Sequence, residues 1–173
     1  MIMKKSNENQ KMVYLLDDDP VFSHALELWF ELEGYRIKTF HNVYAFFKGL
    51  KHREPDIVIL DFALNEDDEG ISTGDQVAEL ISQNNKELPV IMLSAQTDIQ
   101  VAVDLFSKNI IDYVVKNEQF HFNLKQILTK LHEVSNLKRE IRELKINSKI
   151  RLKRIGFVLG FLFLFWTVYT FLL

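Results

Sequence analysis

The sequence predicts an α/β fold built on a five-stranded parallel, doubly wound sheet, followed by a long helix and one transmembrane helix. Short apolar runs alternate along the chain with segments whose apolar residues recur every three or four positions. That alternation is typical of a parallel sheet covered by helices, and the right-handed crossover rule fixes most of its topology. The last 19 of the 173 residues contain no charged side chain, which predicts the membrane-spanning helix.

Five segments have the character of β-strands. Residues 57–60 are four consecutive apolar residues that end on Asp61, as suits a central parallel strand buried on both faces. Comparable apolar runs and one alternating segment predict the other strands over 12–16, 35–40, 90–93 and 111–115.

Helical periodicity predicts the segments between the strands. The first helix is expected to begin after Asp19, which serves as its N-cap, and to stop before Gly34. Its apolar positions recur at steps of three and four: Val21, Phe22, Ala25, Leu26, Leu28, Trp29 and Leu32. Further helices are expected over 43–51, 74–83, 99–107 and from residue 120 onward.

Charge divides the chain into two parts. Residues 1–119 carry a formal charge of −10 and residues 120–173 carry +7. Cysteine is absent, which excludes disulfides and cysteine metal sites, and the five histidines show no ligand spacing and are assigned no role. The expected organisation is a flexible tail (1–11), one α/β domain (12–132), a charged linker helix (133–154) and the transmembrane helix (155–173).

Polar side chains stand at the ends of four predicted strands. Asp17 and Asp18 follow the first strand, Asp61 the third, Ser94 the fourth and Lys116 the fifth. Because parallel strands end at one edge of a sheet, we expect these groups to converge. Three carboxylates in one small site repel each other unless a cation is present, and Mg²⁺ prefers such oxygen ligands.

Four motifs on these strand ends resemble the receiver domain of two-component response regulators, which has a flavodoxin-like fold. They are VYLLDDDP, PDIVILD, PVIMLSAQ and DYVVK, spread over residues 12–132. The resemblance implies that Asp61 is the phosphoacceptor, which takes a phosphoryl group from a phosphohistidine of a sensor histidine kinase or phosphotransfer protein. It also implies a Mg²⁺ site formed by Asp17, Asp18, Asp61 and the carbonyl of Ala63.

The same resemblance implies a switch. Ser94 matches the hydroxyl residue that hydrogen-bonds the phosphoryl group, and Lys116 matches the lysine that pairs with it. Tyr113 matches the aromatic residue that turns inward when the hydroxyl moves. Phosphorylation would then add charge, draw Ser94 and Lys116 toward it and repack the neighbouring face.

Two departures from the family pattern bear on the phosphorylation lifetime. Asn117 follows the lysine where the family usually has a proline, so a trans bond or an adjusted turn is expected. The loop 65–74 has four consecutive acids, no proline and a few additional residues. Those acids either lie solvated in the loop or act on the phosphodonor or on Mg²⁺.

The C-terminal third predicts location and oligomeric state. Leu137, Ile141 and Leu144 form a narrow apolar stripe, which fits either a parallel coiled coil that makes a homodimer or a monomeric linker helix. Lys149, Arg151, Lys153 and Arg154 precede the uncharged segment, whose helical length of about 28 Å suits a bilayer. The positive-inside tendency then places the receiver domain in the cytoplasm, at the inner membrane.

The sequence therefore indicates a membrane-tethered receiver that switches protein–protein interaction in a phosphorelay. No effector domain is expected, and nucleic acid is not an expected partner, because lipid headgroups explain the basic run. The alternative is a constitutive membrane-anchored adaptor that is not controlled by phosphorylation. An enzyme of the phosphohydrolase class is disfavoured because such enzymes need a second acid two residues after the nucleophile, where this chain has Ala63. The downstream protein is not identified by the sequence.

Overall fold

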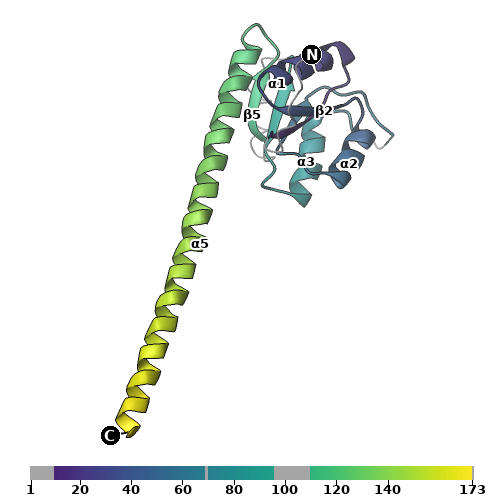
Figure 1. Ribbon diagram of the computed structural model, residues 1–173. Coiled ribbons are helices and arrows are strands. Elements are labelled where there is room, and N and C mark those ends of the chain that lie inside the picture. Colours follow the sequence, from purple (N-terminus) through teal and green to yellow (C-terminus); the bar gives the residue numbers. More distant parts are fainter. Residues whose placement is uncertain (1–9, 69, 96–109, 173) are drawn as a thin grey trace, which may run out of the picture. The chain divides into compact units, whose positions relative to one another are not determined.

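The computed structural model describes residues 10–68, 70–95 and 110–172. The chain divides into two compact units, residues 1–124 and 125–173. The first contains the sheet and the second is helical (Figure 1).

The first unit is built on a five-stranded sheet whose neighbouring strands are all parallel. Its strands are β1 (Met12–Leu16), β2 (Arg36–Phe40), β3 (Ile57–Asp61), β4 (Val90–Ser94) and β5 (Ile110–Val115). They lie in the order β2-β1-β3-β4-β5, which confirms the predicted doubly wound sheet. Leu16 pairs with Leu60, and Asp61 pairs with Leu93, so the carboxyl ends of β1, β3 and β4 align at one edge.

Burial explains the composition of the strands. Every residue of β1, β3 and β4 is buried, as continuous apolar runs predict for strands covered on both faces. Strand β2 is an edge strand, and its residues alternate between exposed and partly buried positions before the buried Phe40. The alternating and continuous patterns thus separate the edge from the centre of the sheet.

In the described part of this unit, three helices connect successive strands from β1 to β4. They are α1 (Pro20–Leu32), α2 (Val43–His52) and α3 (Gly74–Asn84). Val43, Phe46, Val77 and Ile81 of α2 and α3 join one core cluster with Tyr14, Leu16, Val58, Leu60 and Met92 of the sheet. The helix expected over 99–107 lies outside the described residues.

The ends of α1 are as expected, but its buried side is narrower than the sequence suggested. Asp19 is the N-cap, since its carboxylate accepts hydrogen bonds from the backbone N–H groups of Val21 and Phe22, and Gly34 has a φ of +86° after the last turn. Leu26 is buried together with Phe30, while Val21, Leu28 and Leu32 are exposed. The seven apolar positions cover more of the helix surface than one contact with the sheet can bury, which explains the difference.

The long C-terminal helix is α5 (Phe120–Leu172), and it is uninterrupted over 53 residues. In the first unit its first turn is anchored by Phe120 and Leu124, which are both buried. Within the described part of the chain, no helix combines the length and apolar character needed to cross a membrane. The predicted transmembrane helix 155–173 is therefore not confirmed, and many of its side chains, including those of 161–165, lie outside the described part.

Candidate functional site

Three carboxylates converge where β1 and β3 end. One oxygen atom from each of Asp17, Asp18 and Asp61 lies within 4.8 Å of the others. Asp17 is fully buried, Asp61 is 8% exposed and Asp18 is partly buried. The last apolar pair of the neighbouring strands β1 and β3 is Leu16 and Leu60. The residues that directly follow this pair therefore lie close together.

Lys116 joins two of these carboxylates. Its Nζ atom lies 2.8 Å from Oδ2 of Asp17 and 3.0 Å from Oδ1 of Asp61. The same ammonium group stands 4.1 Å from the centre of the Phe22 ring, a cation–π contact that further fixes its position. The backbone N–H of Lys116 donates to the carbonyl of Ser94 at 2.7 Å, so β4 fixes the position of the Lys116 backbone.

The Asp17 segment is held by several hydrogen bonds. The backbone N–H of Asp19 donates to Oδ1 of Asp17 at 2.9 Å, and the hydroxyl of Ser23 donates to the Asp17 carbonyl at 3.4 Å. The Nδ1 atom of His41 lies 2.9 Å from the same carbonyl, which makes it the donor there because the carbonyl only accepts. Asp17 is therefore oriented from α1 and from the end of β2.

Burial raises the pKa of the Asp61 carboxyl group to about 6. The positive charge of Lys116 opposes this rise, and the negative charge of Asp17 adds to it. A hydrogen bond from Lys116 and one from the backbone N–H of Phe62 lower the pKa, but burial outweighs them. With a pKa of about 6, the Asp61 carboxyl group of the metal-free protein changes its charge near pH 6.

The donor set fits Mg²⁺. This ion is hard and takes carboxylate oxygens, a carbonyl and water, and three carboxylates within 4.8 Å offer those oxygens with an excess of negative charge. Asp17, Asp18 and Asp61 are the side chains that would hold it. Ala63 lies two residues past Asp61 in the loop, and its role as a carbonyl ligand stays a prediction.

The loop that follows Asp61 folds back on itself. Ala63 and Thr73 form an antiparallel bridge, and the backbone N–H of Leu64 donates to the carbonyl of Ser72 at 2.9 Å. At the far end, Asp67 accepts from the backbone N–H of Ile71 at 2.8 Å through its side chain. The acidic loop is thus a small hairpin, and the carboxylate of Asp67 stabilises it through this hydrogen bond.

The hairpin also contacts the carboxylate cluster. The backbone N–H of Asn65 donates to Oδ2 of Asp18 at 3.1 Å. The hairpin then leads directly into α3, whose N-cap Thr73 forms a capping box with Gln76. The loop therefore orients Asp18 through the Asn65 amide, and it supplies Thr73 as the N-cap of α3.

The remaining predicted switch residues lie nearby on β4 and β5. Ser94 is buried at the end of β4, and Tyr113 stands on β5 beside Met92 and packs against the core cluster. Their roles in a switch stay predictions. The described residues contain no cis peptide bond, as expected for the bond between Lys116 and Asn117.

At least three contacts of the site were not anticipated from the sequence. They are the Phe22 ring against Lys116, the His41 ring against Asp17 and the Asn65 amide against Asp18. Phe22 was assigned to the core face of α1 by periodicity, and His41 lacked any ligand spacing. His41 and Asn65 lie just beyond the ends of β2 and β3, and that position could have indicated a role at the site, whereas Phe22 lies inside α1 and carries no such signal.

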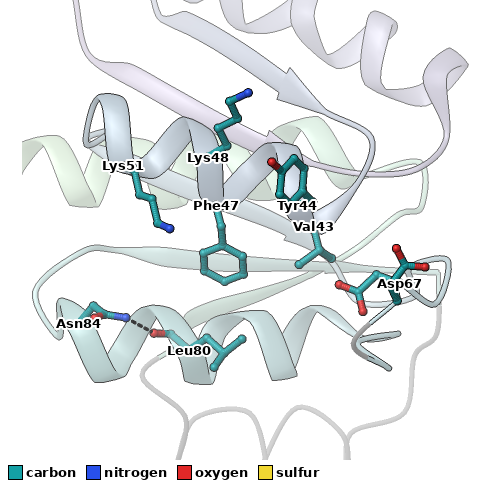
Figure 2. Close-up of a pocket in the computed structure, with 9 residues that line it drawn as sticks. Val43, Tyr44, Phe47, Lys48, Lys51, Asp67, Leu80 and Asn84 are labelled. Carbon is teal, nitrogen blue, oxygen red and sulfur yellow. Dashed lines mark hydrogen bonds between the residues drawn. The ribbon is translucent and has the colours of Figure 1, made fainter.

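A cavity of about 600 Å³ lies away from this site, between α2 and α3. Figure 2 shows Phe47 and Lys51 of α2 facing Leu80 and Asn84 of α3, with Asp67 of the hairpin at one end. None of the carboxylate cluster lines it. We assign no function to this cavity.

Comparison with known proteins shows which family the chain is similar to. The family description "Response regulator receiver domain" matches residues 13–132. The chain is 27% identical over 134 residues to the nitrogen assimilation regulatory protein NtrX of Azorhizobium caulinodans, covering 77% of this chain and 28% of that protein. It is 28% identical over 158 residues to the response regulator protein TmoT of Ectopseudomonas mendocina, covering 90% and 70%.

Solved structures give the same fold. The response regulator TrrA of Thermotoga maritima, in complex with Mg²⁺-BeF, matches with a TM-score of 0.61 and 33% identity, over 70% of this chain and 99% of that one. The receiver domain of a putative Luxo repressor from Vibrio parahaemolyticus matches with a TM-score of 0.66 and 21% identity, over 76% and 97%.

This chain spans only 28% and 22% of the first two curated relatives, NtrX and a DNA-binding transcriptional regulator NtrC from Proteus hauseri. The match lies in the part that carries the carboxylate cluster and Lys116. This chain belongs to the response regulator receiver family of two-component signalling.

Proposed function

We propose that Asp61 accepts a phosphoryl group from a phosphohistidine of a sensor kinase or phosphotransfer protein, and that the output is a change in protein–protein interaction at a membrane. The observation that carries this proposal is the position of the Lys116 ammonium group between Asp17 and Asp61, with Asp18 close to both. Such an arrangement offers a nucleophilic carboxylate, cation ligands and a fixed positive charge in one place.

The transfer forms one bond and breaks one. An oxygen of the Asp61 carboxylate attacks phosphorus, the new P–O bond forms, and the P–N bond to the donor histidine breaks with its electron pair returning to the imidazole. Lys116, already 3.0 Å from Asp61, compensates charge on the phosphoryl oxygens. Mg²⁺ held by Asp17, Asp18, Asp61 and the Ala63 carbonyl would neutralise further charge on those oxygens. The hydroxyl group of Ser94 donates a hydrogen bond to the phosphoryl group after transfer.

In this proposal the chain is a phosphoryl carrier and switch, with no enzymatic reaction on a separate substrate. Ala63 supports this assignment because a phosphohydrolase of the strand-end aspartate type needs an acid at that position. The relative NtrC is a DNA-binding transcriptional regulator. The expectation that this chain has no nucleic-acid partner therefore needs its own measurement, for which a gel-shift assay with genomic fragments suffices.

The proposed location is the cytoplasmic face of the inner membrane. Its support is the sequence alone: residues 155–173 carry no charge, and four of the six residues from Lys149 to Arg154 are basic. The test is extraction of membranes at high pH after expression of the full chain and of a chain that lacks residues 155–173. We expect the full chain in the membrane pellet and the shortened chain in the supernatant. An equal distribution of the two would contradict the tether.

Phosphorylation is tested by intact mass. The full chain, in detergent, is treated with acetyl phosphate and Mg²⁺, and one added phosphoryl group is expected on the wild type and none on Asp61→Asn. Asp68→Asn is the matched control, because it removes a carboxylate from the loop that follows Asp61 and should still be phosphorylated. Absence of an adduct on the wild type would favour the constitutive adaptor instead.

A further inference from the structure

The second unit presents a row of exposed apolar side chains. Val134, Leu137, Ile141 and Leu144 follow one another at steps of three, four and three, and they are between 49% and 63% exposed. On an α-helix those steps place all four on one side. Most of the stability of a helix in a protein comes from packing of its apolar side, so a partner that covers this row would stabilise the helix.

The branching of these side chains selects a type of partner. In heptad terms Val134 and Ile141 occupy a positions, while Leu137 and Leu144 occupy d positions. Residues branched at Cβ at a, combined with leucine at d, favour a parallel two-stranded coiled coil. The row therefore fits a second helix with the same pattern in the same direction.

The charges that flank the row agree with this choice. Glu133 and Glu140 occupy g positions, and Lys138 and Lys145 occupy e positions. In a parallel pair each g residue faces the e residue five positions later in the partner, so Glu133 meets Lys138 and Glu140 meets Lys145, with opposite charge in both cases. An antiparallel pair would set glutamate against glutamate and lysine against lysine, which is repulsive.

The same register shows where the pairing stops. The next a and d positions after Leu144 are Ser148 and Arg151, and the d position before Val134 is Lys130. Polar or charged side chains at these places end the apolar seam on both sides. The seam is therefore about two heptads long, and pairing through it alone is weak and depends on protein concentration.

We propose that residues 133–147 pair with the same segment of a second copy of this chain as a parallel two-stranded coiled coil. The row of four apolar side chains forms its core, and the glutamates and lysines on either side set its direction. This pairing does not rest on phosphorylation of Asp61, and its tests use unphosphorylated protein, so the two proposals fail separately.

The first test uses single cysteines in a chain that has none of its own. In a parallel pair the d residue Leu144 lies next to its own counterpart, so Leu144→Cys should form a disulfide-linked dimer under mild oxidation. Arg139→Cys is the matched control, because residue 139 is an f position on the outer side of the pair. With the full chain in detergent we expect at least tenfold more dimer from Leu144→Cys. Equal yields, or none from Leu144→Cys, would overturn the proposal.

The second test exchanges the charges of one interhelical pair. Glu140 and Lys145 are five residues apart, a spacing at which side chains of one helix do not meet, so any coupling between them reports contact between two chains. Glu140→Lys and Lys145→Glu should each raise the dimer dissociation constant roughly five- to tenfold, and the double exchange should restore it. Sedimentation of the full chain measures the constant, and circular dichroism checks that helix content is unchanged. Single variants that pair as well as the wild type, or a double variant as weak as the singles, would contradict the parallel register.

Discussion

The Nζ atom of Lys116 lies 3.0 Å from Oδ1 of Asp61, although β3 and β5 are separated by β4 in the sheet. The lysine side chain spans the width of β4, and its backbone is fixed there by the hydrogen bond to the Ser94 carbonyl. The charge beside Asp61 is therefore set by the geometry of the sheet edge and by the Phe22 ring. This geometry makes the properties of Asp61 measurable consequences of its neighbours.

Removal of the lysine charge should raise the pKa of Asp61. Lys116 is the largest influence that lowers this pKa, so in Lys116→Met the carboxyl group should hold its proton to a higher pH than the value of about 6 in the wild type. The carboxyl carbon shift of Asp61, followed by NMR in a metal-free titration, measures it. Lys48→Met removes a lysine distant from the cluster and should leave the titration in place. An unchanged pKa in Lys116→Met would contradict the electrostatic role.

The stability of the metal-free protein should fall as pH rises through the titration of Asp61. The folded-state pKa of about 6 lies above the unfolded value of 3.8, so between these values the folded state binds more protons than the unfolded state. Its contribution to the free energy of unfolding therefore decreases from about pH 4 to about pH 6 and stays constant above. Asp61→Asn has no titrating group at this position and lacks this loss. At pH 7 its free energy of unfolding should therefore exceed that of the wild type by on the order of 2 kcal/mol.

Urea unfolding in the presence of a chelator measures that difference at pH 4 and at pH 7. The comparison between the two pH values isolates Asp61, because the other titrating groups are common to both proteins. Added Mg²⁺ should reduce the difference, since binding to the folded wild type stabilises it. A difference that does not grow with pH would show that burial does not control this carboxyl group.

Gly74 should not tolerate a side chain. A Cβ atom there would lie 2.2 Å from the backbone oxygen of Asp61 and 2.9 Å from Sδ of Met92. Since the backbone of β3 cannot move aside, Gly74→Ala should push α3 away and lower the free energy of unfolding by about 1–3 kcal/mol. Gly156→Ala is the control, because a Cβ atom at Gly156 meets nothing within 4 Å. Thermal unfolding of both variants checks this, and equal stability would contradict the close approach.

The hairpin after Asp61 should depend on Asp67 through a hydrogen bond and not through charge. The Asp67 carboxylate accepts from the backbone N–H of Ile71, whereas Asp68 is exposed. Asp67→Ala should therefore accelerate hydrogen exchange at the Ile71 amide, and Asp68→Ala, which removes the same charge, should not. Equal acceleration in both variants would indicate an effect of charge alone.

The sequence was sufficient for the sheet because its strands are almost uniformly apolar. The apolar run in Ile57–Asp61 is typical of a strand that is covered on both faces. The parallel arrangement of the strands then brings Asp61 toward Asp17 and Lys116. The register between neighbouring strands is regular near the carboxyl ends, so strand-end residues converged as expected. Local pattern and long-range geometry coincide in this part of the chain.

Other features depend on contacts that a local pattern does not contain. His41 contacts the Asp17 carbonyl because β2 pairs with β1, so that the residues that directly follow Phe40 and Leu16 are neighbours. The hairpin requires the pairing of Ala63 with Thr73, ten residues apart, in a segment whose acids predict only exposure. Exposure of Leu28 and Leu32 in α1 follows from the limited surface that one helix presents to the sheet.

The hairpin has a consequence for how this domain tolerates change in length. Its base is closed by the Ala63–Thr73 bridge and the Leu64–Ser72 hydrogen bond, and its tip lies beyond them. Residues added at the tip therefore displace neither Asp61 nor the first turn of α3. Each doubling of such a loop costs only about 0.6 kcal/mol of closure entropy. Insertions of a few residues can accumulate here over evolutionary time while the sheet edge that carries Asp61 keeps its geometry.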